Sequence, residues 1–220
     1  MCGRYTLTAD PTFVQEELGL RVAPAHHPRF NIAPTQAALV VTAQRRDEAT
    51  VARWGLIPPW AKDVRIASQT FNARAETIAE KPAFKDAFVH RRCLVPADGF
   101  YEWPHGQPVH LALPHRAIFT FAGLWESWRS HDGEQIDTFT IITTTANETL
   151  KGVHTRMPVL VPRALRSTWL DASVTDARAL LVPWSGETIS ITEVGDAVGT
   201  ASHEGPDCLA PPTRRQLALF

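Results

Sequence analysis

The sequence contains little cysteine. Its 220 residues include only three, Cys2, Cys93 and Cys208, which lie far apart with no CxxC pair among them. An odd count at such spacings argues against a disulfide framework, and no motif supplies the histidine partners that a zinc site needs. We therefore expect free thiols in a reducing cytosol, and neither a metal nor another cofactor.

Long hydrophobic runs are also lacking. The N-terminal segment MCGRYTLTAD has no apolar stretch of the kind that signal peptides need, and no run approaches the roughly eighteen apolar residues of a membrane-spanning helix. These absences predict a protein that does not bind membranes and is located in the cytoplasm, near the nucleoid if the source is bacterial.

An excess of positive charge is the third absence. The formal net charge is −1, which is unlike the broad basic surface of a protein that coats duplex DNA. If nucleic acid binds this chain, the positive charge that attracts it must be local.

The chain has enough apolar material, 44% of its residues, to form one compact domain. Asp10 and Pro11 predict the start of a helix, because aspartate caps helix N-termini and proline suits the first helical position. Strands are predicted at 38–42, 49–54, 92–95, 99–103, 109–113, 117–125 and 139–145, and further helices at 82–90, 163–170 and 176–183. Strands that do not alternate with helices favour an α+β domain over residues 1–206, with 207–220 as a mobile tail.

Cys2 is the first candidate for chemistry. A methionine before a small residue is normally removed, and this would give Cys2 a free α-amine beside its thiol. Reference pKa values near 8 for the amine and 8.5 for the thiol leave both partly nucleophilic at neutral pH. Together they condense with an aldehyde, first as a Schiff base and then as a five-membered thiazolidine. Position alone is a weak signal, because most cysteines at the second position have no such role.

The segment FNARAET places Asn72, Arg74 and Glu76 at alternate positions. In an extended chain these side chains point to one face. An amide, a guanidinium and a carboxylate in a row predict either a polar pocket or a solvated strand face, and the pattern alone favours neither.

Three further segments offer candidate side chains. Glu102 lies among aromatic residues in GFYEW, where burial would raise its pKa and suit it to proton transfer. The alternation of side chains along a strand could equally turn the carboxylate to water. His154, in HTRMP, is a candidate proton carrier beside Arg156. Trp54 and Trp60 flank the prolines of WGLIPPW; exposed tryptophans would stack on bases, but burial in the core is the commoner outcome.

Longer motifs occur in a fixed order along the chain: MCGRYTLT, RFNIAPTQ, WGLIPPWAKD, FNARAET, RRCLVPADGFYEW, IITTTAN, HTRMPVLV and VGTASHEGP. They span Met1 to Pro206 and together resemble the SRAP family, whose members shield abasic sites in single-stranded DNA. The resemblance implies a compact α+β domain around a mainly antiparallel, β-barrel-like sheet with short peripheral helices. A monomer is the default expectation.

The resemblance also implies roles for the candidate catalytic residues. Cys2 would join the aldehyde of an abasic deoxyribose in a covalent DNA–protein crosslink. Asn72 would hold and polarise the sugar oxygen or the forming adduct. Glu102 would shuttle protons, and His154 would help to open the sugar ring.

DNA contacts follow from the same resemblance. Arg4 and Arg74 would bind phosphates beside the lesion, because arginine reads phosphate through bidentate hydrogen bonds. Asn31 to Pro34 and Trp54 to Trp60 would form an apolar rim against neighbouring bases. Two positions depart from the family pattern: Ala61 follows Trp60 where many members have an aromatic or polar residue, and His203 stands in the late segment where the family favours an amide, so no role is assigned to it.

Three rival functions remain open at this point. A cysteine peptidase could use Cys2, Glu102 and His154 to remove Met1, in the manner of an N-terminal nucleophile hydrolase. A non-covalent binder of single-stranded DNA would depend on tryptophan stacking and would not need Cys2. A lyase would use the Schiff base at Cys2 to cleave the strand or to release the adduct.

Overall fold

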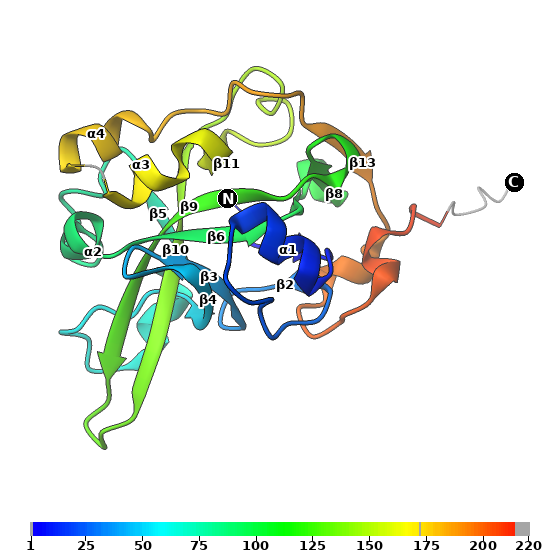
Figure 1. The fold of residues 1–220 in the computed structure, drawn as a ribbon. Coiled ribbons are helices and arrows are strands. Elements are labelled where there is room, and N and C mark those ends of the chain that lie inside the picture. Colours follow the sequence, from blue (N-terminus) through cyan, green and yellow to red (C-terminus); the bar gives the residue numbers. More distant parts are fainter. Residues whose placement is uncertain (1, 172, 214–220) are drawn as a thin grey trace, which may run out of the picture.

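The computed structural model describes residues 2–171 and 173–213 (Figure 1). Five strands close into a barrel in the order β10–β4–β3–β6–β9 and back to β10. The barrel strands are β3 (Ala37–Thr42), β4 (Arg45–Trp54), β6 (Arg92–Ala97), β9 (Phe119–Arg129) and β10 (Gln135–Thr145). All neighbouring strands are antiparallel except β4 and β10, which confirms the predicted barrel-like, mainly antiparallel sheet.

Gly123 allows the barrel to close. It lies opposite Cys93 on β6 and opposite Ile141 on β10, so three strands meet at this position. A Cβ atom on Gly123 would lie 2.9 Å from Cys93 Sγ and 3.0 Å from the carbonyl oxygen of Thr140. The strands can approach this closely because glycine has no side chain.

A second, antiparallel sheet carries the N-terminus. Its strands, in spatial order, are β13 (Ser190–Glu193), β8 (Val109–Ala112), β7 (Gly99–Glu102), β1 (Tyr5–Leu7) and β2 (Arg29–Ile32). Because β1 lies between β7 and β2, the residues just before it reach the end of β7.

Three short strands extend the barrel sheet. Strand β5 (Asn72–Arg74) pairs in parallel with β10, and β11 (Arg156–Pro158) pairs antiparallel with the end of β10. Strand β12 (Leu160–Val161) pairs with β9. Strand β10 therefore brings the FNARAET and HTRMP motifs to neighbouring positions.

The α-helices in the described part of the chain are short and lie around the sheets (Figure 1). They are α1 (Pro11–Leu18), α2 (Lys85–His90), α3 (Arg166–Asp171) and α4 (Val174–Ala179). As predicted, Asp10 caps α1, since its carboxylate accepts from the backbone N–H groups of Thr12 and Phe13 at 2.9 and 3.0 Å. None of the helices in the described part of the chain is long and apolar enough to cross a membrane.

Each predicted strand corresponds to an observed one, and three of them differ from the prediction by more than two residues at one end. Strand β4 begins at Arg45 rather than at residue 49. Strand β9 continues to Arg129 and β10 begins at Gln135, so the two strands form the long hairpin that projects in Figure 1. The packed chain also continues past the predicted boundary at 206, because Pro206–Leu209 forms a 3-10 turn that buries Cys208. Of the predicted tail, residues 214–220 lie outside the described chain.

Candidate active site

Strand pairing brings Cys2 to Glu102. Tyr5 pairs with Phe100 across β1 and β7, and the N–H of Tyr101 donates to the carbonyl of Arg4 at 3.0 Å. Cys2 has no exposed surface, and Glu102 is 5% exposed. Burial and the nearby charge of Glu102 raise the pKa of the Cys2 thiol, and burial also raises the pKa of the Glu102 carboxyl. Burial thereby favours the neutral form of each group.

Asn72 reaches the same point from β5. Its Nδ2 donates to the backbone carbonyl of Cys2 at 2.7 Å, whereas its Oδ1 is buried and has no hydrogen-bond partner. The indole N–H of Trp54 donates to the carbonyl of Phe71 at 2.7 Å and so fixes the backbone just before Asn72. The site therefore contains an oriented amide with one acceptor left for a ligand.

His154 completes the group from the loop before β11. The N–H of Arg156 donates to its Nδ1 at 2.9 Å, which leaves the proton of the neutral ring on Nε2. Burial raises the pKa of Glu102, and His154 acts electrostatically on the same carboxyl and lowers its pKa. The structure thus brings together Cys2, Asn72, Glu102 and His154, the four residues expected to be catalytic.

An ion pair that the sequence did not predict supports His154. Arg156 binds Glu76 through two hydrogen bonds of 2.9 and 3.0 Å and donates to the carbonyl of Thr143 at 2.6 Å. The bond to Arg156 lowers the pKa of Glu76. Because the same residue donates its backbone N–H to His154, the pair fixes the position of the imidazole. Both residues belong to motifs noted above, but only the fold shows that they meet.

Arg4 and Arg74 form no ion pair with any carboxylate in the described chain. Arg74 is exposed, while Arg4 is half-buried, donates to the carbonyl of Gly3 at 2.9 Å and has a buried Nε without a partner. Burial lowers the pKa of Arg4. Both guanidinium groups are free to bind an anion beside Cys2 and Asn72.

The expected rim is only partly at the surface. Trp60 is 58% exposed and Pro34 is half-buried, but Trp54 and Asn31 have no exposed surface. Trp54 packs on Tyr5 and Phe139 in the barrel core. The side chains of Trp54 and Asn31 therefore support the rim and do not form its surface, which corrects the expectation for these two residues.

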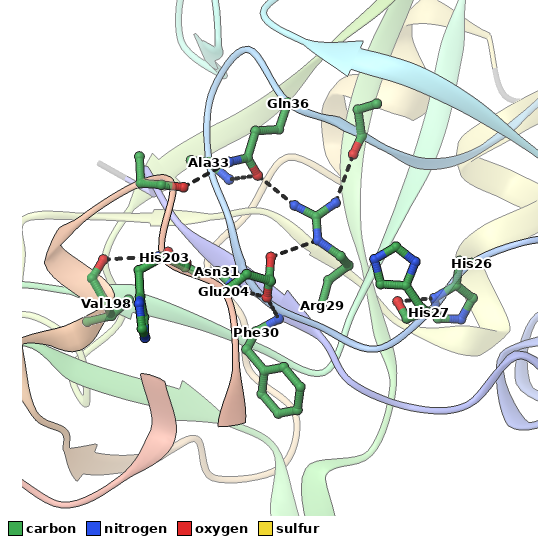
Figure 2. Close-up of polar contacts among 12 residues, drawn as sticks. His26, His27, Arg29, Phe30, Asn31, Ala33, Gln36, Val198, His203 and Glu204 are labelled. Atoms are coloured by element: carbon green, nitrogen blue, oxygen red, sulfur yellow. Dashed lines mark hydrogen bonds and ion pairs between the residues drawn. The ribbon is translucent and has the colours of Figure 1, made fainter. Parts of the chain in front are cut away.

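Asn31 instead anchors the C-terminal part of the chain (Figure 2). Its Nδ2 donates to the carbonyls of Val198, Thr200 and His203 at 3.3, 2.9 and 2.9 Å. Nearby, Glu204 accepts from Arg29 Nε at 2.8 Å and from the backbone N–H of Asn31 at 3.1 Å. These bonds fasten the segment 198–204 to β2.

Comparison with known proteins agrees with this architecture. The family model "SOS response associated peptidase (SRAP)" matches residues 1–201. "Abasic site processing protein YoqW" of Bacillus subtilis (strain 168) is 36% identical over 221 residues, covering 95% of this chain and 99% of its own. "Abasic site processing protein HMCES" of Xenopus tropicalis is 28% identical over 264 residues, covering 96% of this chain and 78% of its own.

A solved structure has the same fold. The crystal structure of a protein from Bacteroides thetaiotaomicron superposes with a TM-score of 0.86 at 26% identity, covering 96% of this chain and 100% of that one. The match of the family model to nearly the whole described chain, together with these relatives, decides the assignment. The chain belongs to the SOS response associated peptidase (SRAP) family.

Proposed function

We propose that this protein recognises abasic sites in single-stranded DNA and shields them through a covalent bond to Cys2, formed after Met1 is removed. The proposal is supported by the relatives named as abasic site processing proteins. The observation that carries it is the position of Cys2, with Asn72 bonded to its carbonyl at 2.7 Å and the buried Glu102 beside its thiol.

The first step needs an open-chain aldehyde. An abasic deoxyribose is mostly a closed hemiacetal. His154 Nε2 gives its proton to the ring oxygen while a solvent water passes the proton of the C1′ hydroxyl back to Nε2, so that the sugar opens to the aldehyde. The α-amine of Cys2 then attacks C1′ and forms a carbinolamine. Loss of water from the carbinolamine gives a Schiff base, with Glu102 donating the proton that leaves with the hydroxyl group.

The second step closes a ring. The Cys2 thiol gives its proton to the Glu102 carboxylate, and Sγ adds to C1′ as the C=N electron pair moves to nitrogen. The product is a thiazolidine, and one water is lost overall. Glu102 suits both transfers because its burial raises its pKa toward the working pH.

The remaining residues bind the strand. The unpaired Oδ1 of Asn72 accepts from the amine or a sugar hydroxyl, while Arg4 and Arg74 bind flanking phosphates. Trp60 offers an exposed aromatic face to a neighbouring base. A thiol without exposed surface cannot meet a substrate, so we propose that removal of Met1 also opens the approach to Cys2.

Hydrolysis of the Met1–Cys2 bond is a second candidate activity, favoured by the carboxyl of Glu102 beside Cys2. In this reaction Glu102 would act as the base for an attacking water. Lyase activity through the Schiff base is a further outcome of the same chemistry. We also propose a monomer in the cytoplasm, which size-exclusion chromatography and cell fractionation would test.

A denaturing gel tests the trap. Protein lacking Met1 is mixed with a single-stranded oligonucleotide that carries one abasic site, and with the same oligonucleotide with all bases present. A heat-stable shifted band is expected only with the abasic site, for wild type and for Cys93→Ala, whose thiol is equally buried in the barrel wall. Loss of the band in Cys2→Ala supports the proposal, and a band that persists in Cys2→Ala refutes it.

A further inference from the structure

A turn near the end of the described chain brings three potential metal ligands together. Cys208 has no exposed surface, whereas the side chains of His203 and Asp207 are 40% and 57% exposed. One nitrogen, oxygen or sulfur atom of each lies within 4.8 Å of those of the other two. None of the three belongs to the site around Cys2.

The donor set is chemically specific. His203 Nε2 and Asp207 Oδ2 are 2.7 Å apart, so the imidazole and the carboxylate already face a common point, and Cys208 follows Asp207 in the chain. Nitrogen, oxygen and sulfur donors together suit a borderline-soft divalent cation such as Zn²⁺ better than Mg²⁺ or Ca²⁺. Three protein ligands would leave a fourth tetrahedral position for water.

The backbone that carries these ligands is held in place. The carbonyl of His203 accepts from Asn31 Nδ2 at 2.9 Å, and Glu204 binds the N–H of Asn31 at 3.1 Å (Figure 2). The N–H of Cys208 donates to the carbonyl of Gly205 at 3.1 Å. A cation would therefore meet ligands whose main chain needs little reordering, which lowers the cost of binding.

The local charge also favours a cation. Two carboxylates, Asp207 and Glu204, lie in the same short segment as the Cys208 thiol. Glu204 is neutralised by Arg29 at 2.8 Å, which leaves Asp207 as the carboxylate next to the thiol that can bind an ion.

We propose that His203, Asp207 and Cys208 bind a divalent cation of the zinc type, and that this cation stiffens the turn 203–208, which Asn31 and Glu204 hold against β2. Binding replaces the hydrogen bond between His203 and Asp207 and displaces the thiol proton, which passes to the solvent. Because Cys208 packs against Tyr101, next to Glu102 on β7, the ion would also stiffen the wall behind the Cys2 site.

Titration with Co²⁺ tests the proposal, because a thiolate bound to cobalt gives a charge-transfer absorption in the near ultraviolet. The measurement is made on Cys2→Ala protein freed of metal, since the aminothiol of Cys2 could itself chelate the ion. We expect the absorption to saturate at one equivalent and to disappear when Zn²⁺ is added. Zn²⁺ should also raise the Tm of this protein.

Variants assign the ligands. Adding Cys208→Ser should abolish the absorption. Loss of a residue that only hydrogen-bonds to a metal ligand weakens metal binding by about 10–100-fold. Adding His203→Asn, which removes a ligand itself, should therefore weaken Co²⁺ binding by about 100-fold or more. His131→Asn is the control, because His131 lies beside Asp132 at 3.6 Å but belongs to no three-donor cluster in the described chain. His203 is half-exposed, so its replacement leaves the fold intact. A folded Cys2→Ala protein without the absorption, or equal Co²⁺ affinity in His203→Asn, would overturn the proposal.

Discussion

The side-chain amide of Asn72 donates to the backbone carbonyl of Cys2 at 2.7 Å, while the oxygen of the same amide is buried without a hydrogen-bond partner. The first contact fixes the N-terminal segment against β5. The second leaves a buried acceptor that is costly to keep unpaired and that an incoming amine or hydroxyl group would satisfy. Asn72 thus connects the position of the nucleophile to recognition of the substrate.

Replacing Asn72 should slow the reaction far more than it destabilises the fold. We expect Asn72→Ala to lower the single-turnover rate of crosslinking by about 10²-fold, as for loss of one oriented polar group at a reacting centre, and the free energy of unfolding by about 1 kcal/mol. Asn147→Ala is the matched control, because it removes a similar amide-to-carbonyl bond of 2.9 Å to Trp184 away from the site. Similar rates in the two variants would contradict the role of Asn72.

Glu102→Gln should give a more stable but less active protein. Burial raises the pKa of Glu102, so the folded state binds this proton more tightly than the unfolded state does. Stability from this group is then fully present below the usual glutamate pKa of about 4.3 and is lost as the pH rises through the folded-state value. Glutamine avoids this loss, so we expect Glu102→Gln to be more stable than wild type at pH 8 and no more stable at pH 4.

Denaturant unfolding at the two pH values checks the stability, and crosslinking assays check the rate, which should fall by about 10²–10⁴-fold. Glu134→Gln, at an exposed position on the β9–β10 hairpin, is the control for loss of a surface charge. A wild-type protein that is the more stable of the two at pH 8 would show that Glu102 is stabilised in its charged form.

The sequence predicted the fold class and most strands because their β-branched and aromatic runs are long enough to show a pattern. It missed β1, β2, β5, β11, β12 and β13, each of two to four residues, because such strands form only through pairing with distant partners. Tyr5, for example, pairs with Phe100 and Ile32 at once. Strands this short have too few residues to show an alternation.

The four residues expected to be catalytic were identified through motifs, but their meeting point depends on the fold. Sequence spacing could not show that Glu76 pairs with Arg156 across 80 residues, or that the indole N–H of Trp54 donates to the carbonyl of Phe71. The cluster at His203, Asp207 and Cys208 was missed for another reason. Its donors lie within the short segment HEGPDC, which lacks the paired spacing of known zinc motifs.

The two hydrogen bonds between Arg156 and Glu76 should support the crosslinking rate through their geometry as well as through charge. Lysine keeps the charge but cannot form both bonds, so Arg156→Lys should lower the crosslinking rate by about tenfold through misplacement of His154. The acid limb of the pH profile of the rate should shift to higher pH, because the bond to Arg156 lowers the pKa of Glu76 and lysine provides only part of that bonding. Arg21→Lys, in an exposed ion pair with Asp47, should leave both the rate and the profile unchanged. Equal behaviour of the two variants would show that the Arg156 pair does not position His154.

Arg74 should contribute to DNA affinity through phosphate. On Cys2→Ala protein, where no covalent bond forms, Arg74→Ala should reduce the slope of log K against log salt by about 0.7 for single-stranded DNA. Arg129→Ala, which alters an exposed residue of the β9–β10 hairpin, should leave the slope unchanged. Fluorescence anisotropy at several salt concentrations measures both. An unchanged slope for Arg74→Ala would place the phosphates elsewhere.

Intact mass spectrometry of the purified conjugate would show whether the α-amine and thiol of Cys2 condense with the abasic aldehyde. We expect a mass equal to protein without Met1 plus oligonucleotide minus one water, with the modified peptide beginning at Cys2. Borohydride should leave this mass unchanged, since a thiazolidine has no C=N bond to reduce. A conjugate that gains two hydrogens would be an unclosed Schiff base, and a linkage at any residue other than Cys2 would refute condensation at the N-terminal cysteine.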